Sequence, residues 1–274
     1  FGHRRLGVAP AGPMDAPAHR AANALVGNGI GAATLECTLT GPTLRFLAPT
    51  MVAVTGADLG AILRRSDLGD WEVPRGRRFL ARAGSVLAFR GRRTGCRAYL
   101  AFGGGIDVPP VLGSRSTDLV GGFGGHAGRP LRAGDVLALG RAPAVAATEA
   151  CPLPSFDSPA TVRVLLGPQD DHFEAESLER LLGTEYAVTS LSDRVGCRLS
   201  GAPLRHVGRP EIVTDGMICG SIEVPPEGQP IVMMADAPTT GGYPKVATVV
   251  TADLPRVAQL VPGEGRVRFR PVDP

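Results

Sequence analysis

Short runs of β-branched and aliphatic residues, separated by glycine and proline, recur along most of this 274-residue chain. β-branched side chains favour extended backbone, and 37 glycines and 25 prolines supply frequent turns between the runs. Regularly spaced short strands with few helices are typical of a closed barrel or a sandwich, so we expect a mainly β fold. The candidate strands are Met51–Thr55, Val86–Phe89, Ala98–Phe102, Val136–Leu139, Thr161–Leu166, Ile231–Met234, Val246–Val250 and Arg266–Phe269.

Helical patterns are confined to two or three short segments. The first covers about Ala16–Val26, where Asp15 can cap the free backbone N–H groups. The second covers about Asp171–Leu182, which begins with acidic residues that the helix dipole favours. Leu254–Leu260 is a candidate for a third helix.

A proline-rich stretch, Ala142–Pro159, divides the chain into two halves. It carries Pro143, Pro152, Pro154 and Pro159 among alanines and small polar residues, a composition typical of a linker. We therefore predict an N-terminal β-rich domain over residues 1–145 and a C-terminal β-barrel domain over residues 155–274.

The charge balance argues against a dedicated nucleic-acid binder, because the net charge is only +3. Residues 1–150 contain 18 arginines and 10 acidic residues, a balance of +8, whereas residues 151–274 contain 11 basic and 16 acidic residues, a balance of −5. The basic half suits an acidic partner, which includes this chain's own second half. No apolar run approaches the ~20 residues of a membrane-spanning helix.

Cysteine and histidine spacing predicts neither disulfides nor a metal site. The five cysteines are odd in number and include no C-x-x-C pair, and the five histidines are scattered. Buried, reduced thiols in a cytoplasmic protein are the expected arrangement. A catalytic cysteine stays open, but the sequence marks none of the five for that role.

Two glycine clusters, Gly103–Gly105 and Gly121–Gly125, resemble phosphate-binding loops only superficially. A nucleotide P-loop requires G-x-x-x-x-G-K-[ST] between a strand and a helix, and neither cluster has the lysine or a following helical pattern. We interpret both as turns of a β fold, with a backbone nest for a carboxylate or phosphate as the alternative.

The segment Asp236–Lys245 carries the most concentrated set of reactive groups. It is a polar loop between two apolar strands, and it combines a carboxylate, hydroxyls, a glycine pair, a phenol and an ammonium. Its candidate binding residues for a small anionic or amide substrate are Thr239, Thr240, Gly241, Gly242 and Tyr243.

Lys245 is the only lysine of the chain, beside 28 arginines. A position that keeps lysine in such a composition can need a compact ammonium or an amine whose pKa can fall. We therefore predict catalytic roles for Lys245 and for Asp236, which would transfer a proton or orient the ammonium. The alternative is that a single lysine is an accident of composition.

Three arginines are further candidates for holding a carboxylate. Arg194 and Arg198 are four residues apart, and Arg115 is flanked by hydroxyl side chains. A structural ion pair or turn is the alternative for each of them.

Motifs that run in one order along nearly the whole chain resemble those of the allophanate hydrolase subunit 2 family, also called the biotin-dependent carboxyltransferase or Kip-anti-inhibitor family. The first half contributes Gly7–Asp15, Ala22–Asn28, Gly41-Pro42, Thr55–Asp58, Tyr99–Ala101, Gly104–Pro109 and Leu112–Thr117. The second half contributes Gly167–Asp171, Asp193-Arg194, Arg198–Gly201, Val224–Pro226, Gly228–Pro230, Thr239–Lys245, Ala252–Leu254 and Ala258–Leu260.

The resemblance implies two cyclophilin-like β-barrel domains and three alternative functions. The first is a subunit of an ATP-dependent 5-oxoprolinase, a cyclic amide hydrolase that is active only with an A-type and a B-type (allophanate hydrolase subunit 1-like) subunit. The second is the carboxyltransferase part of a urea carboxylase, with biotin as cofactor. The third is a non-catalytic regulator that binds a kinase-inhibitor partner.

We rank the 5-oxoprolinase subunit first, because the chain lacks biotin-carboxylase and biotin-carrier sequences. ATP would then act in the complex without a P-loop in this chain. The family commonly has Ser-Glu-Gly where this chain has Thr214-Asp215-Gly216, and often has glutamine where this chain has Glu223. A polar pair of the family is replaced by Ala237-Pro238. These departures concern the expected pocket and therefore the identity of the substrate.

Overall fold

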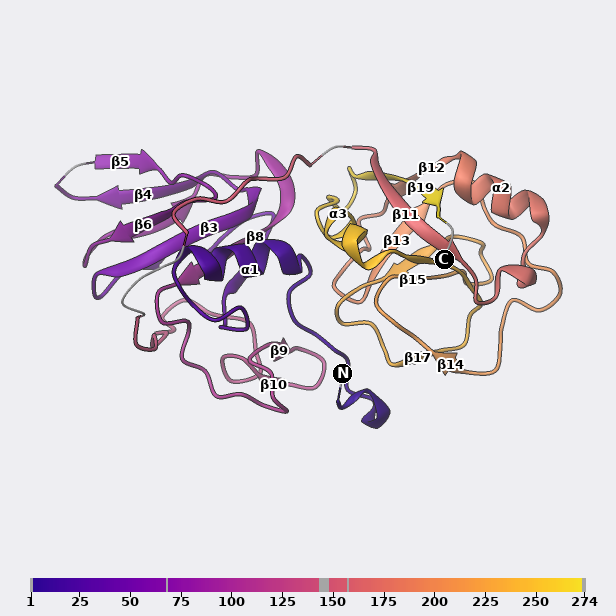
Figure 1. Ribbon diagram of the computed structural model, residues 1–274, viewed down its shortest axis with the longest axis horizontal. Helices are drawn as coiled ribbons and strands as arrows, with labels where there is room; N and C mark the ends of the chain where they lie inside the picture. The colour runs from indigo at the N-terminus through magenta and orange to yellow at the C-terminus, as the bar shows by residue number, and fades with distance from the viewer. Residues whose placement is uncertain (1, 68, 143–147, 157, 273–274) are drawn as a thin grey trace. The chain divides into compact units, whose positions relative to one another are not determined.

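The computed structural model describes residues 2–67, 69–142, 148–156 and 158–272 (Figure 1). The chain divides into a C-terminal unit, formed by Phe1–Met14 with Phe156–Pro274, and an N-terminal unit, formed by Asp15–Ser155. The first 14 residues thus belong with the second half of the chain. The predicted boundaries at residues 145 and 155 lie near this division, and the assignment of residues 1–145 and 155–274 to two domains stays a prediction.

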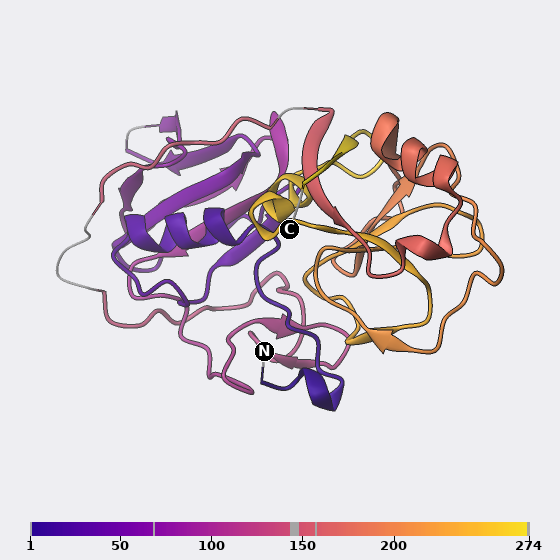
Figure 2. The same ribbon diagram turned by 45° about the vertical axis from the view of Figure 1, so that its right-hand side comes forward.

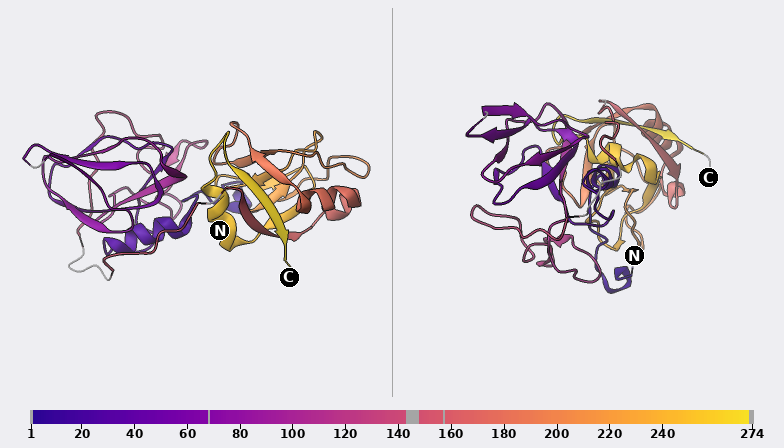
Figure 3. Two further views of the ribbon diagram at one scale, coloured as in Figure 1. Left: turned by 90° about the horizontal axis from the view of Figure 1, so that it is seen from above. Right: turned by 60° about the vertical axis from the view of Figure 1, so that its left-hand side comes forward.

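A closed seven-stranded barrel forms the C-terminal unit, and Figure 3 shows it from two further directions. The strand order around the barrel is β11 (Ala160–Leu166), β18 (Lys245–Val249), β15 (Ser221–Glu223), β16 (Ile231–Met233), β13 (Gly196–Ser200), β12 (Glu185–Val188) and β19 (Arg266–Pro271). Neighbours pair antiparallel except β11 and β19, which pair parallel and close the ring. Alternate residues such as Val162 and Val164 point inward and are fully buried, as period-2 patterning requires.

Helix α2 (Ala175–Gly183) packs on the barrel core through Leu181, Leu178 and Leu182. The predicted start of this helix at Asp171 is wrong. A separate 3-10 turn, η2 (Asp170–His172), comes first, and the buried Phe173 is then extended and pairs with His206. The chain reaches helical geometry only after that strand-like residue. Near the end of the chain, η3 (Thr251–Asp253) leads into α3 (Leu254–Ala258), where the third helix was expected.

A small two-stranded ribbon lies outside the barrel ring. It pairs β14 (Asp215–Gly216) with β17 (Thr240–Gly241), so it brings the predicted Asp236–Lys245 loop beside a segment that is distant in sequence. Met217 and Ala237 flank the ribbon and pack with Ile231 and Met233 of β16 in an apolar cluster separate from the barrel core. This packing explains why an alanine suits position 237.

Two four-stranded sheets form most of the N-terminal unit. The first has the order β1 (Leu35–Thr38), β8 (Thr94–Phe102), β3 (Thr50–Asp58) and β6 (Arg78–Ala81), and the second β2 (Leu44–Arg45), β7 (Val86–Phe89), β4 (Ala61–Arg65) and β5 (Gly69–Glu72). Helix α1 (Ala16–Leu25) packs across β3 and β8 through Ala22 and Leu25 (Figure 2). The Asp15 side chain accepts a hydrogen bond from Ala18 N, which confirms the predicted N-cap.

The mainly β class is confirmed, and every predicted strand except Val136–Leu139 overlaps an observed one. Val136–Leu139 forms no strand, because Leu139 makes a single bridge to Ile106 and Val136 is exposed. The glycine cluster Gly121–Gly125 forms turns around a short ribbon of β9 (Thr117–Asp118) and β10 (Phe123–Gly124).

The proline-rich stretch is only partly described, because residues 143–147 and 157 lie outside the described residues. Cys151 donates a backbone hydrogen bond to Gly76 O within the N-terminal unit, so this part of the expected linker is paired. Over the described ranges, none of the helices has both the length and the apolar character needed to cross a membrane.

Candidate functional site

Lys245 is a buried lysine at the start of β18. Its side chain is 3% exposed, and Nζ donates a hydrogen bond of 2.7 Å to Oδ2 of Asp215 in β14. An ammonium removed from water is stable only when a counter-charge or hydrogen-bond acceptors replace its hydration. Asp215 supplies that charge from a half-exposed position, so the pair sits at the boundary between the barrel wall and solvent.

Gln169 holds both members of this pair in place. Its Oε1 accepts a hydrogen bond from Lys245 N at 3.1 Å, and its own N–H donates to Lys245 O at 3.1 Å. Its Nε2 donates to Asp215 Oδ2 at 3.3 Å. One amide side chain therefore connects the backbone of Lys245 with its counter-ion.

The pKa of the Asp215 carboxyl is lowered, chiefly by the hydrogen bond from Lys245. Gly216 N donates to Oδ1 at 2.6 Å and adds to the same effect. Asp215 therefore stays ionised at neutral pH, and it acts as a fixed acceptor for the ammonium rather than as a proton donor.

A second carboxylate, Glu223, lies directly across from Lys245 on the neighbouring strand β15. A register shift between Ile222 and Glu223 brings Glu223 opposite Lys245. Glu223 pairs with Lys245 on one side and with Ile231 on the other, and Ile231 lies in the apolar cluster outside the barrel core, so Glu223 and Lys245 share the outer face. Burial raises the pKa of the Glu223 carboxyl, and the positive charges of Arg198 and Lys245 oppose that rise.

Gly241 allows the ribbon to approach this pair closely. A Cβ atom at Gly241 would lie 3.3 Å from Glu223 Oε2 and would collide with Met217 Cε. Because Gly241 pairs with Asp215, the ribbon presents a flat backbone and one carboxylate toward Glu223 and Lys245. The site thus combines an ammonium, an ionised carboxylate, a carboxyl with a raised pKa and a primary amide.

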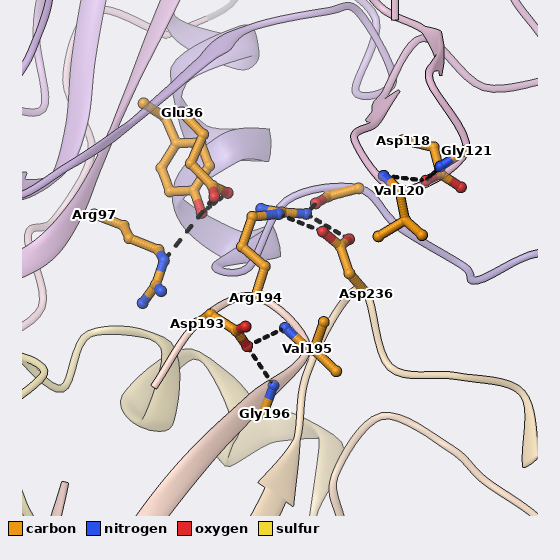
Figure 4. Close-up of polar contacts among 12 residues, drawn as sticks. Glu36, Arg97, Asp118, Val120, Gly121, Asp193, Arg194, Val195, Gly196 and Asp236 are labelled. Atoms are coloured by element: carbon orange, nitrogen blue, oxygen red, sulfur yellow. Dashed lines mark hydrogen bonds and ion pairs between the residues drawn. The ribbon is translucent and has the colours of Figure 1, made fainter. Parts of the chain in front are cut away.

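Asp236 and Arg194 are paired with each other, as Figure 4 shows. Arg194 Nε donates to Asp236 Oδ2 at 2.8 Å and Nη2 to Oδ1 at 2.9 Å, while Nη2 also donates to Gly12 O at 2.7 Å. The expected contact between Asp236 and Lys245 is therefore corrected: the hydrogen-bond partner of Lys245 is Asp215. Both oxygens of Asp236 are used by a guanidinium that also anchors the N-terminal segment.

A tight turn presents Arg194 to Asp236. Asp193 Oδ1 accepts hydrogen bonds from Val195 N at 2.8 Å and from Gly196 N at 3.0 Å (Figure 4). The side chain replaces a backbone acceptor and turns the chain just before β13. The dipeptide Asp193-Arg194 thus combines a turn-forming residue with a clamping residue.

The other predicted binding residues are distributed as follows. Arg198 on β13 is exposed and pairs with Ile231 on β16, which in turn pairs with Glu223 on β15. Thr240 lies in the ribbon and Tyr243 is half-buried beside it. Arg115 belongs to the N-terminal unit, where Nε donates to Val108 O at 3.1 Å. Binding roles for these residues, and for Thr239 and Gly242, stay predictions.

Sequence reasoning did not select Asp215, Gln169 or Glu223 as site residues. The sequence nevertheless contained two signals. Asp215 and Glu223 occupy positions where the chain departs from the family pattern, and Gln169 lies in a motif that the chain shares with the family. Strand pairing brings Asp215 and Glu223 to Lys245, and hydrogen bonds connect Gln169 to them; no local pattern in the sequence encodes either.

A second buried polar cluster lies in the N-terminal unit. The hydroxyl of Tyr99 donates to Glu36 Oε2 at 2.8 Å and accepts from Asp15 N at 2.7 Å, and Arg97 Nε lies 4.0 Å from Glu36 Oε1 (Figure 4). Burial raises the pKa of Tyr99 well above its usual value, so the phenol stays protonated. These contacts fix the N-cap of α1 to β8.

Four of the five thiols, those of Cys37, Cys96, Cys151 and Cys219, are poor nucleophile candidates because burial raises their pKa. Burial raises the pKa of Cys37 to about 12 and that of Cys219 to about 11. A nucleophilic cysteine needs a depressed pKa, since the thiolate is the reactive form. Within the ranges that the structure describes, no three His, Cys, Asp or Glu side chains are arranged to hold a metal ion.

Comparison with known proteins gives a consistent result over nearly the whole chain. The family model described as "Carboxyltransferase domain, subdomain A and B" matches residues 6–271. The chain is 40% identical over 263 residues to the C-type 5-oxoprolinase subunit of Escherichia coli (strain K12), a match that covers 96% of this chain and 83% of that protein. It is 38% identical over 261 residues to the C-type 5-oxoprolinase subunit of Haemophilus influenzae, with coverage of 95% and 82%.

The fold is similar to that of part of a larger solved structure. The crystal structure of the Kluyveromyces lactis urea carboxylase superposes with a TM-score of 0.92 at 33% sequence identity. The match covers 100% of this chain and 26% of that chain, so the present chain corresponds to about a quarter of the larger protein.

Proposed function

Because the chain belongs to the carboxyltransferase domain family, subdomain A and B, we propose that it is the C-type subunit of an ATP-dependent 5-oxoprolinase complex. The observation that carries this proposal is the 40% identity to the C-type 5-oxoprolinase subunit of E. coli, which extends over most of both chains. The complex would open the cyclic amide of 5-oxoproline to give glutamate, and it would require A-type and B-type partner subunits.

The site around Lys245 has suitable chemistry for amide ring opening. In that reaction the carbonyl oxygen gains negative charge, and the ring nitrogen must receive a proton. Lys245, held by Asp215 and Gln169, is a preorganised donor for the oxygen. Glu223, whose pKa is raised, can remain protonated to a higher pH than an ordinary carboxyl and is suited to serve the nitrogen.

We assign ATP binding to the partner subunits. A P-loop requires a lysine directly after its last glycine, and the only lysine of this sequence follows Tyr243-Pro244. The proposal therefore predicts that the isolated chain has no 5-oxoprolinase activity.

The test is reconstitution with the A-type and B-type proteins, followed by an assay of ATP hydrolysis that depends on 5-oxoproline. We expect turnover with all three proteins together and none when this chain is omitted or assayed alone. Robust turnover by the single purified chain would refute the multi-subunit proposal. Full activity of the two partners without this chain would remove it from the reaction.

The second candidate is a carboxyltransferase that moves a carboxyl group from carboxybiotin to a urea nitrogen. The likeness to the K. lactis urea carboxylase, with a TM-score of 0.92, favours it. Urea-dependent ATP hydrolysis in the presence of a biotinylated partner, with no response to 5-oxoproline, would select this function over the first.

A further inference from the structure

An open hollow of about 460 Å³ lies beside the β14–β17 ribbon in the C-terminal unit. The N-terminal segment lines one side of it with Arg4, Arg5 and Gly7, and the ribbon region lines the other with Gly216, Met217, Ile218, Thr239 and Thr240. This volume falls in the range of small-molecule sites. Among the residues that the structure describes, its polar lining consists of guanidinium groups, hydroxyls and backbone and includes no acidic side chain.

The hollow does not include the Lys245 site. None of Lys245, Asp215, Glu223 and Gln169 lines it. Asp215 and Gly241 pair with each other and turn toward Lys245 and Glu223, whereas the adjacent pair, Gly216 and Thr240, lines the hollow. The ribbon therefore contributes neighbouring residues to two separate sites.

The two arginines are presented by a short, well-terminated turn. Arg4–Leu6 form a 3-10 turn that ends at Gly7, which adopts φ +82° and donates its N–H to Arg4 O. A left-handed residue of this kind is easily supplied only by glycine. Further along, Ala11 N donates to Ala235 O, and Gly12 O accepts from Arg194, so the segment is tied to the barrel.

Neither guanidinium has an acidic partner within the described part of the chain. The ion pairs of the C-terminal unit involve its other basic residues, such as Arg163, Arg194 and Lys245. Arg4 and Arg5 thus bring two fixed positive charges to a hollow that also offers hydroxyls. Guanidinium forks bind carboxylate and phosphate oxygens with paired hydrogen bonds.

We propose that the hollow formed by Arg4, Arg5, Thr239 and Thr240 is a binding site for the oxyanion group, carboxylate or phosphate, of a small molecule. The site is separate from the Lys245 site, and the proposal holds whether or not the complex opens 5-oxoproline. Occupancy would fix the N-terminal turn against the ribbon, and through Gly216 it would stabilise the position of Asp215.

The experiment is isothermal titration of the whole chain with sodium phosphate and, separately, with sodium acetate as the carboxylate probe, both at constant ionic strength in chloride buffer. Arg4→Ala and Arg5→Ala remove the proposed ligands. Arg209→Ala removes one positive charge from an exposed residue of the same unit that does not line the hollow. Lys245→Ala tests whether the anion binds at the lysine site instead.

We expect one-to-one binding of at least one probe, weakened about ten-fold or more in Arg4→Ala and Arg5→Ala. Binding should stay within about two-fold of the unmodified chain in Arg209→Ala. The probe that binds identifies the oxyanion as carboxylate or phosphate. Arg4→Gln and Arg5→Gln repeat the test if either alanine variant has a lowered melting temperature.

The proposal is overturned if neither probe binds, or if Arg209→Ala weakens binding as much as the two hollow variants. It is also overturned if only Lys245→Ala abolishes binding, because the anion would then occupy the lysine site. The reconstitution assay of the complex is a separate measurement, so failure of the proposed function and failure of this site can be distinguished.

Discussion

Lys245 Nζ lies 2.7 Å from Asp215 Oδ2, although 30 residues separate the two along the chain. The lysine is buried and the aspartate is half-exposed, so the pair closes one wall of the barrel toward solvent. Asp236, which is nearer in sequence, is instead held by Arg194. Substitutions at these positions distinguish catalytic from structural roles.

Lys245→Arg should lose activity in the reconstituted complex nearly as severely as Lys245→Ala. The site beside Gly241 and Glu223 accommodates a compact ammonium, whereas a guanidinium is larger, planar and remains protonated at working pH. Loss of one such electrostatic contact typically lowers turnover about 10²–10³-fold. Turnover is measured beside the melting temperature, because a folding defect would imitate the loss. An unchanged rate in Lys245→Ala, with the complex intact, removes this residue from the site.

Asp215→Asn should lower the melting temperature by several degrees at neutral pH, because it removes the charged group that accepts the hydrogen bond of the buried ammonium. The folded-state pKa of Asp215 is lowered, so its contribution to stability is present above the unfolded pKa of about 4 and is lost as the pH falls below that value. The difference between the two proteins should therefore be constant from about pH 5 to 8 and shrink below about pH 4. A melting series over that pH range measures it, and equal melting temperatures at pH 7 contradict the role.

Glu223→Gln should raise the melting temperature slightly at pH 7, by about 1–3 °C. Burial raises the pKa of this carboxyl, so the folded state binds a proton more readily than the unfolded state. Stability therefore falls as the pH rises from the unfolded pKa to the folded pKa of Glu223. The variant removes that penalty, and its advantage should vanish below the unfolded pKa of about 4.3. If Glu223 also transfers a proton, turnover of the complex falls while stability rises. A variant that is both less stable and fully active would contradict both statements.

Asp236→Asn should loosen the first 14 residues of the chain. The change weakens a bidentate pair whose arginine also binds Gly12 O, and charge-assisted hydrogen bonds of this kind contribute about 1.5–3 kcal/mol. Hydrogen exchange should become faster over residues 8–14 than in the barrel strands. Normal exchange in this segment together with lost turnover would instead support the catalytic role predicted for Asp236 from the sequence.

Asp253→Asn should destabilise the C-terminal unit by about 1–2 kcal/mol, since Asp253 accepts three hydrogen bonds from Arg163 at 2.8–2.9 Å and its side chain is 8% exposed. Glu176→Gln is the matched control, because its i,i+4 pair with Arg180 is exposed and is expected to contribute less than about 0.5 kcal/mol. Urea unfolding of both variants gives the comparison. Equal midpoints for the two would show that the Arg163 contacts do not stabilise the barrel.

The fold class and several elements were predictable from local patterns. Asp15 ahead of an alanine-rich segment predicts helix α1, and β-branched runs such as Val86–Phe89 predict strands, because capping and backbone propensity depend on a few neighbouring residues. Val136–Leu139 has the same local character but lacks a continuous partner, so it forms no strand. Propensity is local, whereas a ladder of hydrogen bonds requires a second segment from elsewhere in the chain.

By itself the sequence determined that the chain is mainly β, that it carries the family's motifs in order, and that Lys245 is unusual as its only lysine. Only the tertiary structure decided which groups face that lysine. The β14–β17 pairing brings Asp215 to it, and the register shift in β15 places Glu223 opposite it. Moving a strand by one residue reverses which side chains point outward, so the composition of the site depends on register, which is set by packing across the whole barrel.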